Sequence, residues 1–412
     1  MAVLIVKFGG SCLSTPSNIT SAAQKVAAEV RKGKKVILVV SALTGVTDNL
    51  LKLAQELSSE AVSKMDIDDV LSMGERTSAK LMVTALKSLG LRAIAIDPSS
   101  DIWPIHTDST FGNAKVNLAK TEQTIVGKIK RLLKGGEVIV VPGFIGLSPE
   151  GRVTTLGRGG SDVTAVILGR FTGAKEVIFV KDVNGVLSGD PKIVPAAEII
   201  DTLDAEEMFS LSSAGAKVLH PRSLRYKTDS LTLRVVGFND EDLSHGTLIK
   251  GIVDMDLKAN IHSKQLSMVT IVGNEASSPE TLANIATEAA SSKAKILGLS
   301  VAQSSILFYL QQPADFIQRL HNLIKTQKVA KAIHSFNPLA MILISGQELE
   351  KMPGIVDAVV APLSKHGINL YGVMTISSSI RVFIPWKDRN KALSLIEKGL
   401  NRIKKEGGDL NW

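Results

Sequence analysis

The chain opens with a short apolar run that ends in a lysine and two glycines, Val3-Leu4-Ile5-Val6-Lys7-Phe8-Gly9-Gly10-Ser11. We predict a strand over residues 3–8, because continuous runs rich in Val and Ile suit strands buried on both faces of a parallel sheet. The two glycines then let backbone N–H groups approach a phosphate, and a following helix N-terminus favours negative charge. Lys7 can supply a point charge to phosphoryl oxygens. The alternative interpretation of this glycine pair is a purely structural turn.

Similar runs recur through the first 250 residues and alternate with helical patterns. The further strands that we predict span residues 35–41, 92–97, 137–142, 176–181 and 231–236. Apolar residues recur at helical spacing over residues 17–32, 72–89 and 161–171, and Gly33 suits the position after the first helix. The fold class is therefore α/β, with an open, mostly parallel sheet flanked by helices over residues 1–255. Ligands in such folds lie beyond the carboxyl ends of the strands.

The pattern changes near residue 255 and then repeats. Residues 267–326 read strand, helix, strand, strand, helix, and residues 340–405 repeat that order. Pro279 recurs as Pro353 and Gly298 recurs as Gly372, each 74 residues later. We predict two small ferredoxin-like βαββαβ modules, residues 256–335 and 336–412. Modules of this size have small cores, so we expect them to pair with each other or across subunits.

Composition limits the classes of function. The apolar fraction of 44% is typical of a packed globular protein. The net charge of +8 suits anionic ligands such as ATP, and it would suit nucleic acid, but aromatics at 4% argue against a stacking platform for single strands. The chain has no apolar run of membrane-spanning length and no secretory signal pattern at its start. Its single cysteine, Cys12, excludes an internal disulfide, so we expect a cytoplasmic protein.

The common nucleotide fingerprints are absent, but a second glycine cluster is present. No P-loop pattern occurs, and the stretch that starts at Gly157 carries Asp162 where a dinucleotide-binding fingerprint needs glycine. This stretch reads Gly157-Arg158-Gly159-Gly160-Ser161-Asp162 and precedes a predicted helix. Arg158 is suited to bind a carboxylate through two hydrogen bonds. Asp162 either caps the helix or orients nearby lysines.

Two later segments complete the set of candidate motifs. Residues 181–192 follow a strand and hold two turns, Asn184-Gly185 and Gly189-Asp190-Pro191, which suits a loop that folds over a nucleotide. In Gly215-Ala216-Lys217-Val218-Leu219-His220-Pro221, we place Lys217 late in a helix that the His-Pro step ends. A solvated helix lysine is the alternative interpretation of Lys217.

Taken in order, these segments resemble the aspartokinase branch of the amino acid kinase family. The resemblance covers essentially the whole chain and is nearly letter for letter at residues 154–162 and 215–221. Residues 7–11, residues 41–47 and the pair Gly74-Glu75 also match motifs of the family. The resemblance implies ATP-dependent phosphorylation of the side-chain carboxylate of L-aspartate to 4-phospho-L-aspartate, the first step toward lysine, threonine and methionine.

The resemblance also implies a role for each site residue. Arg158 would bind the α-carboxylate of aspartate and Glu75 its α-ammonium, while the side-chain carboxylate would meet Ser41, Thr47 and Ser161. Asp162 would organise the site beside the ATP phosphates, which would face Lys7, Gly9, Gly10 and Lys217. The nucleotide loop would be lined by Asp182, Asp190 and Lys192. Mg²⁺ would travel with ATP, so we expect no dedicated metal site.

This chain departs from the family at the nucleotide loop. Leu187 stands where relatives usually carry Tyr, and Lys181 and Lys192 stand where Thr and Arg are common. Adenine stacking is thereby in question, and Lys181 adds a candidate phosphate contact.

The tail resembles paired ACT modules, with residues 352–356 and 366–370 matching most closely. Such modules imply an amino-acid effector, lysine or threonine, and a homodimer or higher homo-oligomer; a purely dimerising tail is the alternative. Three other functions stay open: a glutamate or N-acetylglutamate kinase, a non-catalytic amino-acid sensor, and, most weakly, nucleic-acid binding. We expect no nucleic-acid partner and no membrane partner.

Overall fold

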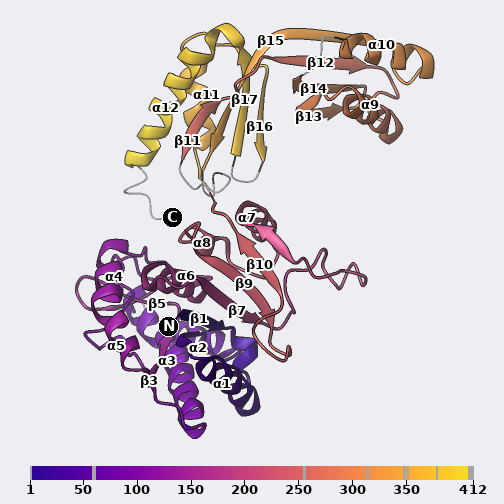
Figure 1. Ribbon diagram of the computed structural model, residues 1–412. Coiled ribbons are helices and arrows are strands. Elements are labelled where there is room, and N and C mark those ends of the chain that lie inside the picture. Colours follow the sequence, from indigo (N-terminus) through magenta and orange to yellow (C-terminus); the bar gives the residue numbers. More distant parts are fainter. Residues whose placement is uncertain are drawn as a thin grey trace. The chain divides into compact units, whose positions relative to one another are not determined.

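The computed structural model describes residues 2–57, 62–253, 257–311, 315–346, 349, 352–376 and 379–406. The chain separates into two compact units, Met1–Asp254 and Met255–Trp412, here called the N-terminal and C-terminal units (Figure 1). The predicted boundary at 255/256 lies outside the described residues. None of the described helices combines the length and apolar character that crossing a membrane requires.

The N-terminal unit is built on an eight-stranded sheet with the order β3-β4-β2-β1-β7-β9-β10-β8. Neighbours from β3 to β9 run parallel, whereas β10 runs antiparallel to β9 and parallel to β8. The mostly parallel α/β sheet predicted from the sequence is confirmed. Its strands are β1 (Val3–Phe8), β2 (Lys35–Val40), β3 (Ala93–Ala95), β4 (Val138–Pro142), β7 (Glu176–Lys181), β8 (Thr202–Asp204), β9 (Thr232–Gly237) and β10 (Thr247–Lys250). A separate hairpin pairs β5 (Ile145–Leu147) with β6 (Val153–Thr155).

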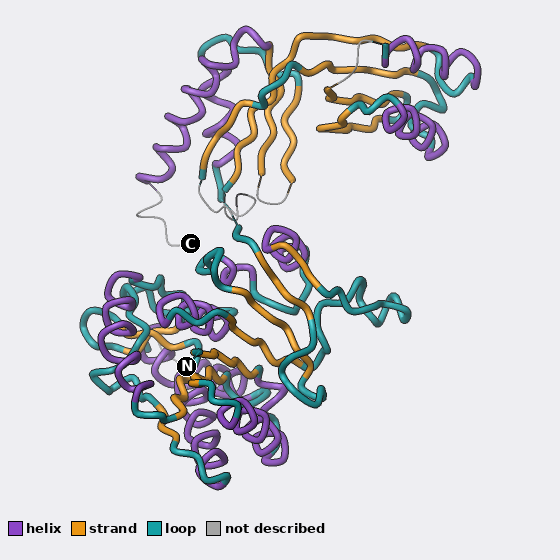
Figure 2. The backbone as a smooth tube through the Cα atoms, in the orientation of Figure 1, coloured by secondary structure: helices purple, strands orange, loops and turns teal. Residues whose placement is uncertain are grey.

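Helices lie on both sides of this sheet (Figure 2). They are α1 (Pro16–Arg31), α2 (Val46–Leu57), α3 (Lys64–Ser88), α4 (Leu118–Thr124), α5 (Lys130–Lys134), α6 (Gly160–Thr172), α7 (Ala205–Ser213) and α8 (Pro221–Leu224). A 3₁₀ turn, Gly10–Leu13, follows β1, and a π-helical turn, Ile125–Ile129, joins α4 to α5. Leu4, Val6 and Phe8 share one core with α1 and α3. Since side chains alternate along a strand, Lys7 faces the opposite side of the sheet, where α6 packs against β1.

Helix α3 is longer than predicted. The apolar spacing indicated a start at residue 72, but the helix begins at Lys64. Ser63 caps it and exchanges hydrogen bonds with Asp66, which is a capping box. The first two turns therefore depend on the cap, and they place Asp68 on the buried side of the helix.

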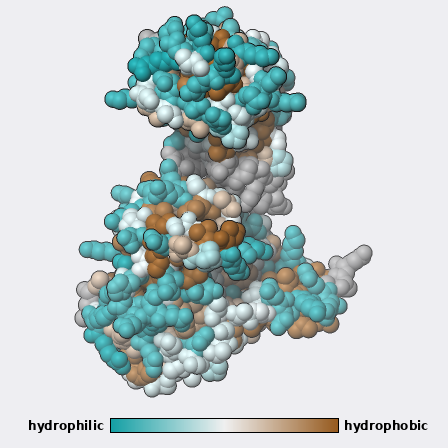
Figure 3. Space-filling model, turned by 90° about the vertical axis from the view of Figure 1, so that its right-hand side faces the viewer, coloured by the Kyte–Doolittle hydropathy of each residue, from teal (hydrophilic) through white to brown (hydrophobic). Residues whose placement is uncertain are grey.

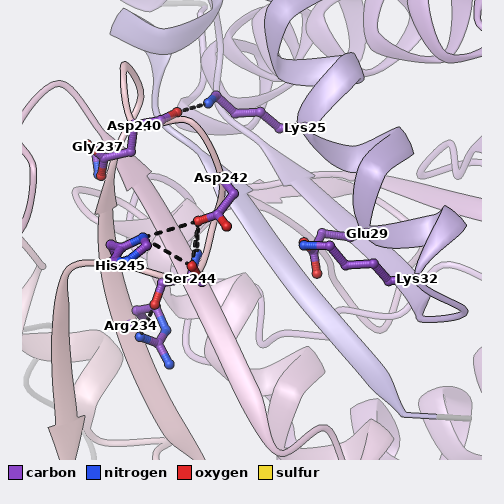
Figure 4. Close-up of polar contacts among 9 residues, drawn as sticks. All are labelled: Lys25, Glu29, Lys32, Arg234, Gly237, Asp240, Asp242, Ser244 and His245. Carbon is purple, nitrogen blue, oxygen red and sulfur yellow. Dashed lines mark hydrogen bonds and ion pairs between the residues drawn. The ribbon is translucent and has the colours of Figure 1, made fainter.

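Polar contacts tie α1 to the loop between β9 and β10 (Figure 4). Lys25 donates a hydrogen bond to the carbonyl oxygen of Asp240, and the Asp240 carboxylate accepts one from Gly237 N at 2.8 Å. On α1 itself, the buried carboxylate of Glu29 pairs with Lys32 at 2.7 Å and with Lys34 at 2.5 Å. Burial opposes the charged form, but the two lysines outweigh it and lower the pKa of Glu29. These contacts hold α1 in place, and α1 directly follows the glycine turn after β1.

The C-terminal unit contains a seven-stranded antiparallel sheet with the order β13-β14-β12-β15-β17-β16, and β11 pairs with β15 off this path. Its strands are β11 (Lys258–Ile261), β12 (Leu266–Val272), β13 (Lys295–Ala302), β14 (Ser305–Gln311), β15 (Ala332–Ser345), β16 (Gly372–Ile376) and β17 (Ser379–Pro385). Its helices are α9 (Pro279–Ser291), α10 (Phe316–Gln327), α11 (Ile355–Lys365) and α12 (Arg389–Glu406). The predicted order of strand, helix, strand, strand, helix occurs twice.

The long strand β15 is shared by the two halves of this unit. Its first part pairs with β12, and its second part pairs with β17 and β11. One apolar core lies under α9 and α10 and another under α11 and α12, and Ala259 of β11 belongs to the second. The predicted module boundary at 335/336 falls inside β15. The division into two modules at that point stays a prediction.

Candidate active site

A cleft of about 260 Å³ lies at the carboxyl ends of β1 and β2 and at the start of α6. Its lining comes from segments far apart in the chain: Lys7, Ser41, Ala42, Thr47, Glu75, Phe144, Gly157, Arg158, Gly159, Gly160, Ser161 and Asp162. The predicted aspartate-binding residues therefore meet in one place, together with Lys7 and Asp162. Their position agrees with the rule that ligands of α/β sheets bind beyond the carboxyl ends of the strands.

Close backbone approaches explain the glycines around this cleft. A Cβ on Gly10 would lie 2.6 Å from the carbonyl oxygen of Ala42, so the turn after β1 can touch the end of β2 only as glycine. Gly9 N donates to the carbonyl oxygen of Val180 at the end of β7. The glycine pair thus lets three strand ends converge beside Lys7.

The carboxylate of Asp162 is the electrostatic centre of the site. Its Oδ1 lies 2.8 Å from Lys7 Nζ, its Oδ2 lies 3.8 Å from Lys181 Nζ, and Oδ2 also accepts a hydrogen bond from His220 N at 3.2 Å. Burial opposes its charge, but Lys181 and Lys7 outweigh that effect and lower the pKa of Asp162 to about 2. The alternative in which Asp162 caps α6 is wrong, because the N-cap residue is Gly159. Asp162 instead orients two cations beside the cleft.

The pKa of Lys181 is lowered as well, and here burial is the largest cause. The neighbouring charge of Lys7 adds to that effect, while Asp162 opposes it. Two ammonium groups held beside one carboxylate leave an excess of positive charge. That excess suits an anionic ligand with several charges, such as a triphosphate.

Glu75 is a buried carboxylate without a full set of partners. It is 4% exposed, and its Oε2 has no hydrogen-bond partner among the described residues. Burial raises the pKa of Glu75 to about 7, although the backbone of Ala42 and the charge of Lys7 favour the ionised form. A buried carboxylate with one unpartnered oxygen in a cleft is suited to bind a cationic group of a ligand.

The loop that carries Arg158 is held from several directions. Arg222 Nη1 donates to the carbonyl oxygen of Leu156 at 2.7 Å and to Asn113 Oδ1 at 2.9 Å. Gly159 has a φ of +77°, and a Cβ there would lie 2.2 Å from the His220 ring. The loop is therefore fixed, while the Arg158 side chain itself is exposed and free to meet a ligand.

Besides Gly9, Gly10 and Lys181, four predicted nucleotide residues lie outside the lining of this cleft. Asp182, Asp190 and Lys192 are exposed on the loop after β7, where Ser188 N donates to the carbonyl oxygen of Glu198 at 2.8 Å. This loop projects on the side that Figure 3 views, where the N-terminal unit shows apolar surface, and its Ile193 is 79% exposed. The fourth residue, Lys217, was placed in a helix, and that prediction is wrong. Helix α7 ends at Ser213, and Lys217 lies exposed in the irregular segment before α8.

Sequence reasoning missed several residues around the cleft. Phe144 lines it with a φ of +69°, and a Cβ on Gly143 would lie 2.6 Å from Ser161 Cβ. The signal was available, because Pro142-Gly143-Phe144 directly follows a predicted strand. Ala42 and Asp68 carried no such signal, since neither residue type stands out in its segment. Among the described residues no cluster of three or more His, Cys, Asp and Glu side chains is arranged to hold a metal.

Comparison of the sequence with known proteins gives consistent matches. The sequence profile described as the amino acid kinase family matches residues 2–237. An aspartokinase of Geobacillus stearothermophilus is 30% identical over 410 residues, which cover 97% of this chain and 96% of that protein. An aspartokinase of Bacillus sp. (strain MGA3) is 29% identical and covers 97% of each chain.

Solved structures share the fold. Aspartate kinase from Synechocystis superposes with a TM-score of 0.78 at 24% identity, covering 97% of this chain and 70% of that chain. E. coli aspartokinase III gives a TM-score of 0.56 at 23% identity, covering 97% of this chain and 99% of that chain. That protein was solved once with aspartate and ADP and once with lysine and aspartate.

Proposed function

This chain belongs to the amino acid kinase family and to its aspartokinases, and from that membership we propose how its cleft performs the reaction. The enzyme uses ATP to phosphorylate the side-chain carboxylate of L-aspartate. The observation that carries the assignment of roles is the shared cleft, in which the Lys7–Asp162 pair lies beside Glu75, Arg158 and Ser161. A cleft of about 260 Å³ thus contains a lysine that can bind phosphate, together with a carboxylate and a guanidinium that can bind the two charged groups of an amino acid.

The charges of the cleft match those of free aspartate. Arg158 binds the α-carboxylate, since a guanidinium can donate two parallel hydrogen bonds to it. Glu75 binds the α-ammonium, which supplies the partner that its buried Oε2 lacks. Ser41, Thr47 and Ser161 hold the side-chain carboxylate. A role for Glu75 as ammonium partner favours a free α-amino group, and so argues against N-acetylglutamate as the substrate.

The chemistry needs no general base. A carboxylate is already ionised near neutral pH, so the barrier comes from repulsion between two anions and from their alignment. Lys7 and the N–H group of Gly10 neutralise the phosphate charge, while the N–H of Gly9 is held by the carbonyl oxygen of Val180. Asp162 holds Lys7 and Lys181 in place. The nucleotide also contacts residues of the loops around the cleft, namely Lys217, Asp182, Asp190 and Lys192. Mg²⁺ would arrive with ATP and would be held mostly by phosphate oxygens and water.

Measuring ADP release with L-aspartate, L-glutamate and N-acetylglutamate as acceptors tests the substrate. We expect turnover with L-aspartate and an acyl phosphate product that hydroxylamine traps. Equal or greater turnover with glutamate would show that the chain is a different acylphosphate-forming amino-acid kinase. Failure to bind ATP at all would favour the non-catalytic sensor.

The C-terminal unit has a proposed regulatory role. We propose that its two ACT-like halves bind an amino-acid effector, lysine or threonine, and join subunits into a homodimer or higher homo-oligomer. The repeated strand and helix order, the two separate cores and the likeness to a protein solved with lysine support this proposal. Adding each amino acid to the turnover assay tests it, and an unchanged rate with both would leave a purely dimerising tail. We expect the enzyme to work in the cytoplasm.

A further inference from the structure

Asp68 is the most buried carboxylate near the cleft, although it does not line it. It is 1% exposed and lies on α3, seven residues before Glu75. Residues seven apart on a helix share a face, so Asp68 and Glu75 point from α3 toward the same side. One rigid helix therefore carries both side chains.

The carboxylate of Asp68 has three hydrogen-bond donors. Its Oδ2 accepts from Thr155 N and from Gly112 N, each at 2.8 Å, and its Oδ1 accepts from Thr155 Oγ1 at 2.8 Å. Burial raises the pKa of Asp68, although these donors act to lower it. The donors come from two other segments, so Asp68 joins α3 to the end of β6 and to the turn at residue 112.

Thr155 leads directly to the Arg158 loop. Its carbonyl oxygen accepts a hydrogen bond from Ala114 N at 2.8 Å, and the next residue, Leu156, donates from its N to the carbonyl oxygen of Phe144 at 2.8 Å. Only Leu156 and Gly157 lie between Thr155 and Arg158. The hydrogen bonds of Asp68 therefore fix where this loop starts relative to the helix that carries Glu75.

We propose that Asp68 is a positioning residue that sets the spacing between Glu75 and Arg158, and with it the fit of the amino acid in the cleft. The proposal rests on the proposed function, in which these two residues hold the α-ammonium and α-carboxylate of aspartate. It predicts a much larger effect on the amino acid than on the nucleotide, because Lys7 lies on β1 and the glycine turn after it contacts Ala42 and Val180, whereas the donors to Asp68 are Thr155 and Gly112.

Substitutions of Asp68 distinguish a positioning role from a general effect on the stability of the protein. In Asp68→Ala we expect the KM for aspartate to rise about 10- to 100-fold, since small misplacements of binding groups cost rates of that order. The KM for ATP should stay within about twofold, because its contacts are unchanged. Asp68→Asn should restore most of the affinity, since its amide oxygen can accept from both N–H groups while its NH₂ donates to Thr155 Oγ1.

Glu29→Ala is the matched control, because Glu29 is also a buried carboxylate with several partners but lies on α1 away from the cleft. It should lower Tm and leave the KM for aspartate unchanged. Should Asp68→Ala fail to fold, Thr155→Val removes only the Oγ1 contact and should still raise the KM for aspartate selectively. Equal changes in both KM values, or none, would overturn the positioning role. Wild-type enzyme without aspartate-dependent turnover would instead overturn the proposed function.

Discussion

At the residue scale, Lys7 combines a buried position with a direct ion pair. It is 5% exposed and lies 2.8 Å from Asp162. We expect Lys7→Ala to lower kcat by about 10²- to 10³-fold, the usual cost of losing one group that stabilises developing charge. The KM for aspartate should change only modestly, because Glu75 and Arg158 remain. Steady-state kinetics check this, and a variant with full turnover would contradict the role of Lys7.

Arg158 offers a cleaner test of binding, because its side chain is exposed and its loss leaves no buried charge behind. Hydrogen bonds to charged groups contribute about 1.5–3 kcal/mol, so Arg158→Ala should raise the KM for aspartate about 10- to 100-fold. The KM for ATP should move far less. Both constants come from one set of initial-rate measurements, and equal losses for the two substrates would reject the assignment.

We expect the binding of aspartate to depend on pH through Glu75. Its pKa of about 7 means that the charged form, which binds an ammonium group, is gained as pH rises through 7 and lost below it. At saturating ATP, the KM for aspartate should therefore be about 10-fold higher at pH 6 than at pH 8. Glu75→Gln should bind more weakly and show a nearly flat profile over this range. The same slope in both proteins would assign the titration to another group.

At the element scale, α6 has a glycine at each end with nearly the same backbone conformation. Gly159 at the N-cap has a φ of +77° and Gly173 at the C-cap has a φ of +76°. A Cβ on Gly159 would overlap the His220 ring, whereas a Cβ on Gly173 would meet no atom within 4 Å. The two positions thus share the conformational cost of a side chain but differ in steric cost.

Alanine at these two positions should separate the two costs. Gly173→Ala should lower the free energy of unfolding by about 1–2 kcal/mol, the cost of a left-handed residue, and leave kinetics unchanged. Gly159→Ala should destabilise more and also raise the KM for aspartate, since it moves the Arg158 loop. Thermal melts with parallel assays provide the comparison, and equal effects of the two changes would show that the His220 contact carries no constraint.

The strands that could be predicted from the sequence are continuous runs of apolar residues. The predicted strands over 3–8, 35–41, 137–142 and 176–181 match observed strands to within a residue, because a run of Val and Ile buried on both faces has few other conformations. Helix α3 was predicted too short, because its first two turns depend on the Ser63 cap. Lys217 was misplaced because α7 ends at Ser213, and Gly215 has a φ of +109°, which does not continue a right-handed helix.

At the scale of the whole molecule, the two units have separate cores, Met1–Asp254 around the parallel sheet and Met255–Trp412 around the antiparallel sheet. We expect differential scanning calorimetry to resolve two transitions. ATP with aspartate should shift one of them, and an effector amino acid should shift the other, by about 2.7 kcal/mol at a hundredfold excess over Kd. A single transition that responds equally to both ligands would show that the units unfold as one.

The sequence by itself determined the α/β class, the repeated order of the tail and the family, because buried strands and glycine turns leave local patterns that need no partner to be read. The resemblance implied that Lys7, Glu75, Arg158 and Asp162 serve one site, and the tertiary structure showed the cleft that they share. The tertiary structure alone decided that Asp68 links two of their supports. It also decided that β15 runs through both halves of the tail. The physical reason is that these are contacts between segments distant in the chain, and they depend on strand order and helix packing that no local spacing encodes.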